Sequence, residues 1–255
     1  MTDSALLTER RDGVLLITIN RPDARNAIDL EAAEGIAAAL DTLDADDDLS
    51  VGVITGAGKG FSSGMDLKAF VSGKRPWVGD RGFAGIVQRS ADKPLIAALE
   101  GFAVAGGLEI ALACDVIVAG RGTKLGVPEV KRSIVAAGGA LLRLPQRVSY
   151  GIAMELALTG DLITAERGHA IGLVDRLVDD GGAVDDALAL AARIAANGPL
   201  ALMATKAVLS RQRDWSEAEF WHKQGEIVGP VFTSEDAREG ATAFAERRAP
   251  VWRGR

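Results

Sequence analysis

The stretch that decides the fold runs from Lys93 to Asp115 and reads KPLIAALEGFAVAGGLEIALACD. Its beginning, Pro94–Leu99, is an apolar run that predicts a strand buried on both faces. Gly106 and Gly107 then open a second apolar run, which predicts a helix. The first N–H groups of a helix have no partner inside it, and the helix dipole favours negative charge there. The sequence therefore predicts a strand-to-helix turn at which the Gly106 N–H can meet a ligand.

Similar apolar runs lie on both sides of this stretch, and each predicts a buried strand: Val14–Ile19, Val51–Thr55, Asp115–Ala119 and Leu173–Val178. Between the first two, apolar residues at helical spacing predict a helix, with Asp29 as its N-cap. Strands that alternate with helices in this way indicate an α/β core built on a mostly parallel sheet.

Beyond Ala136 the patterns are mainly helical. Good helix starts and stops recur there, at Ser149, Thr164 and Pro199 and at Gly160, Gly172 and Gly198 respectively. The segment from Trp215 to Ala245 predicts two amphipathic helices. We therefore expect a core over residues 1–198 and a helical C-terminal region over residues 199–255 that contacts other subunits.

Composition excludes several classes of protein. Of the 255 residues, 48% are hydrophobic and 25% charged, which is typical of a globular chain. A single cysteine, Cys114, excludes an intramolecular disulfide framework, and two distant histidines, His169 and His222, disfavour a zinc site. The net charge of −6 disfavours nucleic acid or an anionic membrane as partner. The N-terminus has no long apolar run, so we expect neither a signal peptide nor a spanning helix, and a cytoplasmic location.

A second glycine-rich segment, Thr55–Phe70, reads TGAGKGFSSGMDLKAF and follows a predicted strand. It is not a Walker phosphate loop, because Gly60 and not Ser or Thr follows Lys59. Its useful feature is Gly64, which permits unusual backbone angles and lets the N–H of Met65 point at a ligand. The loop NRPDARNAID, residues 20–29, carries two arginines and on its own predicts a surface turn.

Two glutamates near these glycines each allow two interpretations. Glu109 either compensates the helix dipole or takes part in chemistry, and Glu129 is either a solvated loop carboxylate paired with Lys131 or Arg132 or a second catalytic group. Two carboxylates in opposite environments can serve as acid and base on one substrate. With the N–H groups of Met65 and Gly106 as an oxyanion hole, the set suits chemistry next to a carbonyl.

Taken together, six segments resemble the crotonase, or enoyl-CoA hydratase, family in sequence and in order. They span Leu6 to Arg255 and read NRPDARNA, GKGFSSGMDLK, KPLIAALEGFAVAGGLEIALACD, PEVKRSIVAAGGALLRLP, ELALTGDLITAERGHAIGLVDRLV and EGATAFAERRAPVWRGR. The resemblance implies a spiral of ββα repeats, a helical trimerisation region, and a homotrimer or a dimer of trimers. It also implies an acyl-CoA thioester substrate, a place in fatty-acid and lipid metabolism, and no cofactor beyond the coenzyme A of the substrate.

The resemblance also implies a role for each matching residue. Met65 and Gly106 would form the oxyanion hole, Glu109 would orient and activate water as a base, and Glu129 would hold that water and protonate the α-carbon. Water would add reversibly across the 2,3-double bond to give a 3-hydroxyacyl-CoA. The coenzyme A would lie along Ala24, Arg25, Ser63, Asp66, Leu67 and Lys68. Phe244 and Arg247 of a neighbouring subunit would help to bind it.

The sequence departs from the family pattern at three places. Ala105 stands where many members have a third glycine, Ala136–Gly139 replaces a PGAGG-like run, and Met65 is bulkier than the usual alanine. The segments FSSGMDLKAF, GFAGI and APVWRGR look closer to the carnitinyl-CoA dehydratase branch, which acts on a cationic substrate.

Rival functions are an enoyl-CoA delta-isomerase, which can work with one carboxylate at the position of Glu129, and a non-catalytic scaffold that binds CoA thioesters or RNA. A Ser-His-Asp hydrolase needs a histidine near its nucleophile, and neither histidine lies in a glycine-rich motif. A glycosidase-like carboxylate pair would leave the oxyanion-type glycines unexplained in a pocket expected to be short of aromatic residues.

Overall fold

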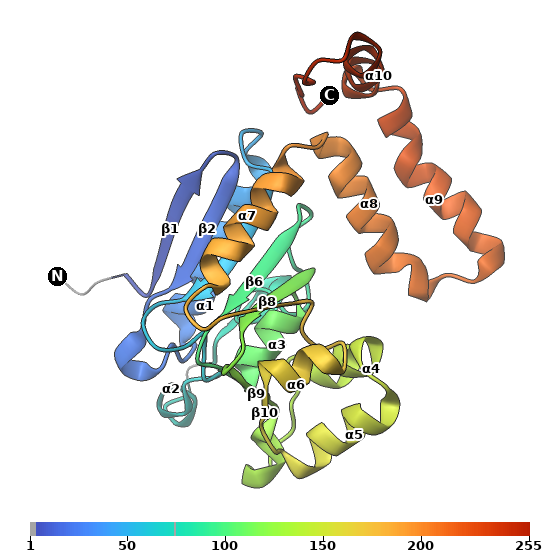
Figure 1. Cartoon of the computed structure of the whole chain (residues 1–255). Helices are drawn as coiled ribbons and strands as arrows, with labels where there is room; N and C mark the ends of the chain where they lie inside the picture. Colours follow the sequence, from blue (N-terminus) through green and yellow to red (C-terminus); the bar gives the residue numbers. More distant parts are fainter. Residues whose placement is uncertain (1–3, 74) are drawn as a thin grey trace.

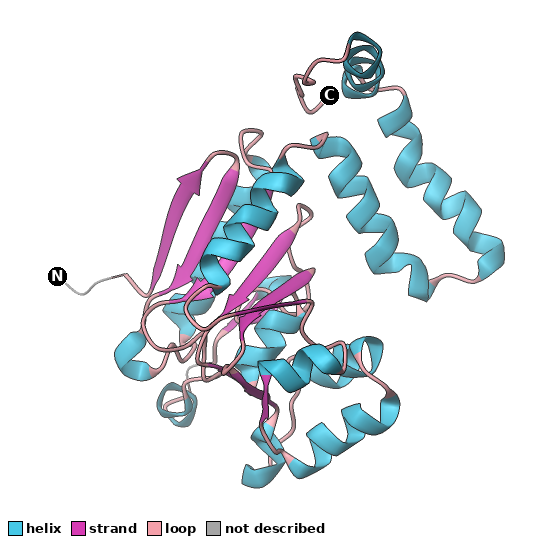
Figure 2. Ribbon diagram, viewed as in Figure 1, coloured by secondary structure: helices cyan, strands magenta, loops and turns pink. Residues whose placement is uncertain are grey.

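A six-stranded sheet forms the centre of the protein in the computed structural model, which describes residues 4–73 and 75–255. The spatial order is β1-β2-β3-β6-β8-β11, and all neighbours are parallel except the β1–β2 pair (Figure 2). The predicted mostly parallel sheet is confirmed. Its strands are β1 (Leu6–Arg11), β2 (Val14–Ile19), β3 (Val51–Gly56), β6 (Leu95–Leu99), β8 (Val116–Gly120) and β11 (Arg176–Val178).

From β2 to β8 both faces of the sheet are buried, as the uninterrupted apolar runs predict. Alternate residues of each strand point to opposite faces. Val14, Leu16 and Val53 pack with helix α7 (Ala183–Ala195), whereas Leu15, Ile17 and Ile54 belong to the main core with α1 (Leu30–Ala45) and α3 (Gly106–Leu112). In Figure 1, α7 crosses one face of the sheet and α1 lies on the other side. Asp29 caps α1 as predicted, accepting a hydrogen bond of 2.9 Å from the Ala32 N–H.

A second, small sheet generates the spiral. It consists of β7 (Phe102–Val104), β9 (Lys124–Gly126) and β10 (Ile163–Thr164) in the order β10-β9-β7, and Ser62 bridges to β7 at Ala103. After β3, β6 and β8 the chain passes through this small sheet and then enters a helix: α2 (Leu67–Val71), α3 or the 3-10 helix η3 (Pro128–Arg132). Each turn is thus a ββα repeat, which is the predicted crotonase-like arrangement.

The remaining elements lie around these two sheets. A hairpin of two-residue strands, β4 (Trp77–Val78) and β5 (Gly82–Phe83), follows α2. Helices α5 and α6 begin after Ser149 and Thr164, as predicted, and α4 begins after Gly139. Gly160 ends α5 in the left-handed conformation. The bounds of these helices are α4 (Ala140–Arg147), α5 (Tyr150–Thr159) and α6 (Ala165–Ala170). Three short 3-10 helices are η1 (Pro22–Ala24), η2 (Gly79–Arg81) and η4 (Gln212–Asp214).

The last three helices form an arm that projects from the sheets (Figure 1). They are α8 (Pro199–Arg211), α9 (Glu217–Phe232) and α10 (Glu235–Glu246). The two amphipathic helices predicted after Trp215 are therefore present. Lys206 ties α8 to the core through an ion pair of 2.7 Å with Asp115 and a bond of 2.9 Å to the carbonyl of Lys93.

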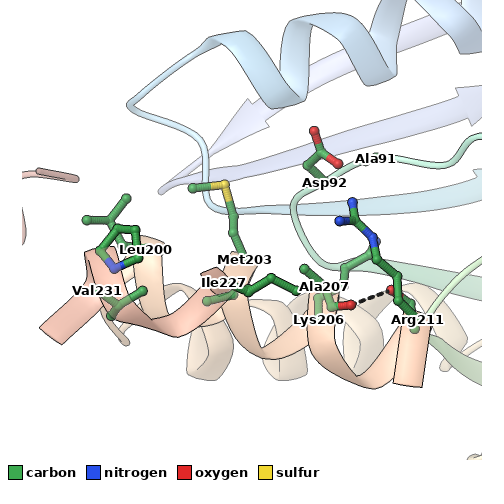
Figure 3. Close-up of a pocket in the computed structure, with 12 residues that line it drawn as sticks. Ala91, Asp92, Leu200, Met203, Lys206, Ala207, Arg211, Ile227 and Val231 are labelled. Carbon is green, nitrogen blue, oxygen red and sulfur yellow. Dashed lines mark hydrogen bonds between the residues drawn. The ribbon is translucent and has the colours of Figure 1, made fainter. Parts of the chain in front are cut away.

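A cleft of about 410 Å³ separates the arm from the core, and we call it the arm cleft. Met203, Ile227 and Val231 supply apolar lining, with Asp92 and Arg211 at its polar end (Figure 3). Among the described residues, no single helix is long and apolar enough to cross a membrane. Helix α7 and residues 199–214 pass that test only jointly, as a pair bent by 110°.

Candidate active site

A cavity of about 890 Å³ brings the predicted site residues together. It opens beside the small sheet, where the glycine-rich turns that follow β3 and β6 meet η3. Ten predicted residues line it: Ala24, Arg25, Ser63, Met65, Asp66, Leu67, Lys68, Gly106, Glu109 and Glu129. Phe244 and Arg247 do not line it, because they lie at the end of α10 in the arm, where Phe244 is 88% exposed.

Two backbone amides lie close together in this cavity. Gly64 has φ +87°, and a methyl group on it would stand 2.7 Å from the amide nitrogen of Gly106. The neighbouring carbonyl and amide of this turn are used, because Ile28 donates to the Gly64 carbonyl and Asp66 donates to that of Ile28. Within residues 4–73 and 75–255, neither Met65 nor Gly106 donates its N–H to a protein acceptor. Both N–H groups are thus available to one ligand oxygen.

The backbone at the entrance of α3 is strained, because an alanine and not a glycine stands at position 105. Ala105 has φ +52° and ψ −130°, a region that glycine occupies far more readily than alanine. Its N–H donates to the Gly126 carbonyl at 2.9 Å, and its carbonyl accepts from Leu108 and Glu109. The small sheet and the first turn of α3 therefore hold Ala105 in this conformation, and the next residue presents its N–H to the cavity.

Glu109 faces the cavity from the first turns of α3 and is only 4% exposed. Its Oε1 accepts a hydrogen bond of 3.2 Å from the N–H of Ala140. Burial, together with the charge of Glu129, raises the pKa of this carboxyl to about 7, while the N–H groups of Ala140 and Gly138 and the charge of Arg143 oppose the rise. A carboxyl with this pKa can accept and return a proton near neutrality, which a dipole-compensating surface glutamate does not do.

Glu129 is not the solvated loop carboxylate that its neighbours allow. It lies in η3 with 8% exposure, and Lys131 pairs instead with Asp161 at 2.6 Å. Its Oε2 is buried and has no hydrogen-bond partner among the described residues. Burial raises the pKa of this carboxyl, while the charge of Arg132 opposes the rise. The unpaired oxygen and the open cavity beside it favour a role with a ligand or water.

The loop over residues 20–29 is more than a surface turn, and Asn26 is the reason. Its buried side chain donates to the carbonyls of Ala57 and Gly60 at 2.8 and 2.7 Å and accepts from the N–H of Arg21. Arg21 also pairs with Asp66 at 3.2 Å. These bonds fix the loop to the glycine-rich segment, so the two motifs form one wall of the cavity.

Cationic side chains gather on that wall and across from it. Arg25, Lys68, Lys131 and Arg132 line the cavity. The guanidinium of Arg25 lies over the ring of Phe102, 4.7 Å from its centre. Such a rim attracts an anionic ligand such as a phosphate ester.

An aromatic wall is the part of the site that sequence reasoning missed. Trp77 and Phe83, from the short β4–β5 hairpin, line the cavity and pack edge to face with ring centres 5.3 Å apart. The Phe83 ring fills the space beside Gly106, where a methyl group would stand 2.6 Å from it. The expectation of a pocket short of aromatic residues is therefore wrong. The only signal lay in the GFAGI segment, which carries Phe83.

No cluster of three or more metal-ligating side chains occurs in the part of the chain that the structure describes. His169 is exposed on α6, and His222 pairs with Glu226 on α9 at 3.3 Å. Cys114 is buried. None of these three side chains lines the cavity.

Comparison with known proteins agrees with this geometry. The model of the enoyl-CoA hydratase/isomerase family matches residues 9–255. The chain belongs to the enoyl-CoA hydratase/isomerase family. It is 41% identical to enoyl-CoA hydratase EchA19 of Mycobacterium tuberculosis, over 98% of this chain and 96% of that protein. It is 39% identical to the carnitinyl-CoA dehydratase of Salmonella typhi over all of both chains.

Solved structures of the family show the same fold. Enoyl-CoA hydratase EchA1 of Mycobacterium marinum superposes with a TM-score of 0.97 at 54% identity, over 99% of this chain and all of that one. The family and the crotonase fold that the six motifs imply are thereby confirmed.

Proposed function

We propose that the protein adds water reversibly across the 2,3-double bond of an enoyl-CoA thioester to give a 3-hydroxyacyl-CoA. One observation carries this proposal: two buried glutamates and two free backbone N–H groups line a single cavity in an enoyl-CoA hydratase/isomerase family member. Hydration needs a base, an acid and a site for the negative charge that develops on the thioester oxygen, and these groups supply all three.

The oxyanion hole consists of the N–H groups of Met65 and Gly106. Both would donate to the thioester oxygen as it gains enolate character, and each is fixed by backbone geometry rather than by a flexible side chain. Because such donors are oriented in advance, they stabilise the transition state at little reorganisation cost. Loss of one donor of this kind typically lowers the rate by ~10²–10³-fold.

The two glutamates divide the proton transfers. Glu109, ionised, takes a proton from water while the water oxygen bonds to the β-carbon, and Glu129 holds the same water and donates a proton to the α-carbon. Their environments support the division, since Glu109 accepts a backbone N–H and the Oε2 of Glu129 is unpartnered among the described residues. The reaction changes no overall oxidation state, so it needs no redox cofactor. We also propose that no metal takes part, because the two N–H groups stabilise the charge on the thioester oxygen.

The coenzyme A would lie along the cationic wall. Arg25 and Lys68 would meet its phosphates, and Ala24, Ser63, Asp66 and Leu67 line the same cavity. Phe244 and Arg247 are too far along the arm to belong to this cavity, so we propose that a neighbouring subunit supplies them. An acyl-CoA substrate would place the reaction in fatty-acid metabolism.

The arm supports a homotrimer or a dimer of trimers. No residue of α8 or α9 is buried within the chain, although large apolar side chains lie on both. Trp221 is 69% exposed and Phe232 is 79% exposed. Further apolar groups are exposed on α4 and α5, including Leu142, Tyr150 and Leu158. Apolar surface of this extent is typical of a subunit interface.

A second candidate is the dehydration of carnitinyl-CoA, and the aromatic wall favours it. A quaternary ammonium group binds well over aromatic faces, which Trp77 and Phe83 could offer. Against this candidate, Asp66 in the same cavity is already paired with Arg21 and caps α2. We therefore rank a neutral enoyl chain first.

The experiment that tests the proposal follows the conjugated thioester absorbance of three substrates with purified protein: crotonyl-CoA, a longer enoyl-CoA and crotonobetainyl-CoA. We expect rapid loss of absorbance with a neutral substrate and a 3-hydroxyacyl-CoA product. Faster loss with crotonobetainyl-CoA would select the second candidate. No loss with any substrate, together with tight binding of a CoA thioester, would reject hydration and favour an isomerase or a non-catalytic binder.

A further inference from the structure

The turn Gly138–Ala140, which leads from η3 into α4, is held between two oppositely charged side chains. On one side, a methyl group at Gly138 would stand 2.3 Å from Oε2 of Glu109. On the other, a methyl group at Gly139, where φ is +105°, would stand 2.2 Å from Nη1 of Arg143. The Ala140 N–H then donates to Glu109. Both glycines are bare because the carboxylate and the guanidinium occupy the space that a side chain would need.

Among the described residues, no carboxylate forms an ion pair with Arg143 that would explain the position of its side chain. The side chain is partly buried in the first turn of α4, and it forms no ion pair among residues 4–73 and 75–255. Its Nη2 instead donates to the Val87 carbonyl at 2.6 Å. Val87 belongs to the segment that begins with Phe83, so this bond joins the glycine turn to the aromatic wall. A cation is costly to desolvate without a carboxylate partner, unless its charge acts on a nearby group.

We propose that Arg143 is a positioning residue for Glu109: it clasps the Gly138–Ala140 turn against that carboxylate and fixes the turn to the aromatic wall through Val87. The inference rests on the proposed function for its catalytic consequence. Independently of the reaction, the proposal states that the turn held by Arg143 fixes the position of the Glu109 carboxylate.

The charges around Glu109 and Arg143 affect the pKa of the Glu109 carboxyl. Glu129 in η3 and Arg143 in α4 both act on Glu109, with opposite signs, and the N–H groups of Gly138 and Ala140 stabilise its anion. Burial lowers the pKa of Arg143 itself, the charges of Cys114 and Glu109 oppose that shift, and the charge of Arg147 adds to it. Because the charge of Arg143 lowers the pKa of Glu109, we expect removal of the guanidinium to raise that pKa.

Three variants test the proposal. Arg143→Gln removes the charge, and Arg143→Lys keeps the charge but cannot both lie along Gly139 and bond to Val87. Arg147→Gln is the control on the same helix, because Arg147 bonds to the backbone carbonyl of Cys114 and pairs with Asp175, and neither contact involves the turn. The readouts are kcat and KM against pH, and the titration of ¹³C-labelled glutamate carboxyls, with Glu109→Gln used to assign the signal.

We expect Arg143→Gln to lower kcat roughly 10- to 100-fold with little change in KM, because the carboxylate moves from its productive place. The acid limb of the rate profile and the Glu109 carboxyl signal should both move to higher pH. Arg143→Lys should keep the limb in place and lose several-fold in kcat, and it decides the question alone if Arg143→Gln does not fold. Arg147→Gln should move neither limb nor signal.

An unchanged Glu109 titration and kcat in Arg143→Gln would overturn the proposal, as would an equal shift in Arg147→Gln or wild-type kcat in Arg143→Lys. The carboxyl titration does not depend on which reaction the protein catalyses. If the wild type hydrates no enoyl-CoA, the proposed function fails while the titration still decides whether Arg143 positions Glu109.

Discussion

At the scale of single residues, Glu109 and Glu129 differ from ordinary glutamates by burial without an ion pair within the described residues. We expect Glu109→Gln and Glu129→Gln each to lower hydration by ~10²–10⁴-fold, because each removes one proton transfer and keeps the shape of the side chain. Crotonyl-CoA kinetics measure the loss, and circular dichroism checks the fold. Glu155→Gln, an exposed position on α5, is the control. Near-normal hydration in either glutamate variant would reject the paired-carboxylate mechanism.

The raised pKa of Glu109 sets a pH dependence of the rate. Its pKa is about 7 in the folded protein, so the base is protonated and inactive below that pH. We expect kcat for hydration to fall as the pH drops through about 7, and the limb to vanish in Glu109→Gln. Steady-state rates between pH 5 and pH 9 measure it. A profile flat across neutrality would contradict the assignment of Glu109 as the base.

The same shift also predicts a stability effect with a definite sign. In the unfolded chain Glu109 ionises near 4.5, and in the folded chain near 7, so the native state binds the proton more tightly. Stability from this group is complete below about 4.5 and declines as the pH rises toward 7. Above that range the ionised group costs as much as roughly 3 kcal/mol. Urea unfolding should therefore show Glu109→Gln gaining stability over wild type at pH 8 and not at pH 5.

At the scale of secondary-structure elements, the entrance of α3 stores strain at Ala105, whose φ is +52°. We expect Ala105→Gly to raise the free energy of unfolding by about 1 kcal/mol, since strain of ~1–3 kcal/mol is relieved and part of it is offset by the greater freedom of glycine in the unfolded chain. Activity should stay near wild type, because the Gly106 N–H keeps its place. Urea denaturation measures the gain, and a loss of stability would mean that the methyl group of Ala105 contributes packing that outweighs the strain.

What the sequence predicts at this scale depends on burial. Val14–Ile19 was predicted with its exact bounds because both faces of β2 are buried and every residue is apolar. Its neighbour β1, Leu6–Arg11, was missed because it is an exposed edge strand rich in charge. The later strand predicted over Leu173–Val178 is real only at Arg176–Val178. Its first apolar residues instead pack in the turn that follows α6.

The site follows the same rule. Glycines and glutamates were predictable because a backbone N–H or a buried carboxylate needs those residue types, and the resemblance placed them together. Trp77 and Phe83 were missed because the β4–β5 hairpin that carries them has strands too short for a periodic pattern. Likewise, the buried bonds of Asn26 join segments some 30 residues apart, and pairings over that separation are decided by the tertiary fold.

At the scale of the whole molecule, the arm is the feature that one chain leaves unfinished. No residue of α8 or α9 is buried within the chain. The arm cleft beside these helices is lined mainly by apolar side chains such as Leu200 and Ile227. A single chain gains little from holding such helices away from its core. The arrangement is favourable once other copies cover the apolar surface, in line with the proposed trimer.

The arm therefore predicts linked losses of assembly and of substrate affinity. We expect the double variant Trp221→Glu with Phe232→Glu to turn a trimer or hexamer into monomers, because each carboxylate would be buried without a partner at the proposed interface. Analytical ultracentrifugation measures the assembly, and Glu155→Gln is the control.

If Phe244 and Arg247 complete the coenzyme A site of a neighbouring subunit, the monomer should show a raised KM for the CoA ester, and Phe244→Ala with Arg247→Gln should raise KM in an intact assembly. A monomeric wild type, or a monomeric variant with unchanged KM, would contradict the site shared between subunits, because the cavity of one chain would then bind the whole substrate.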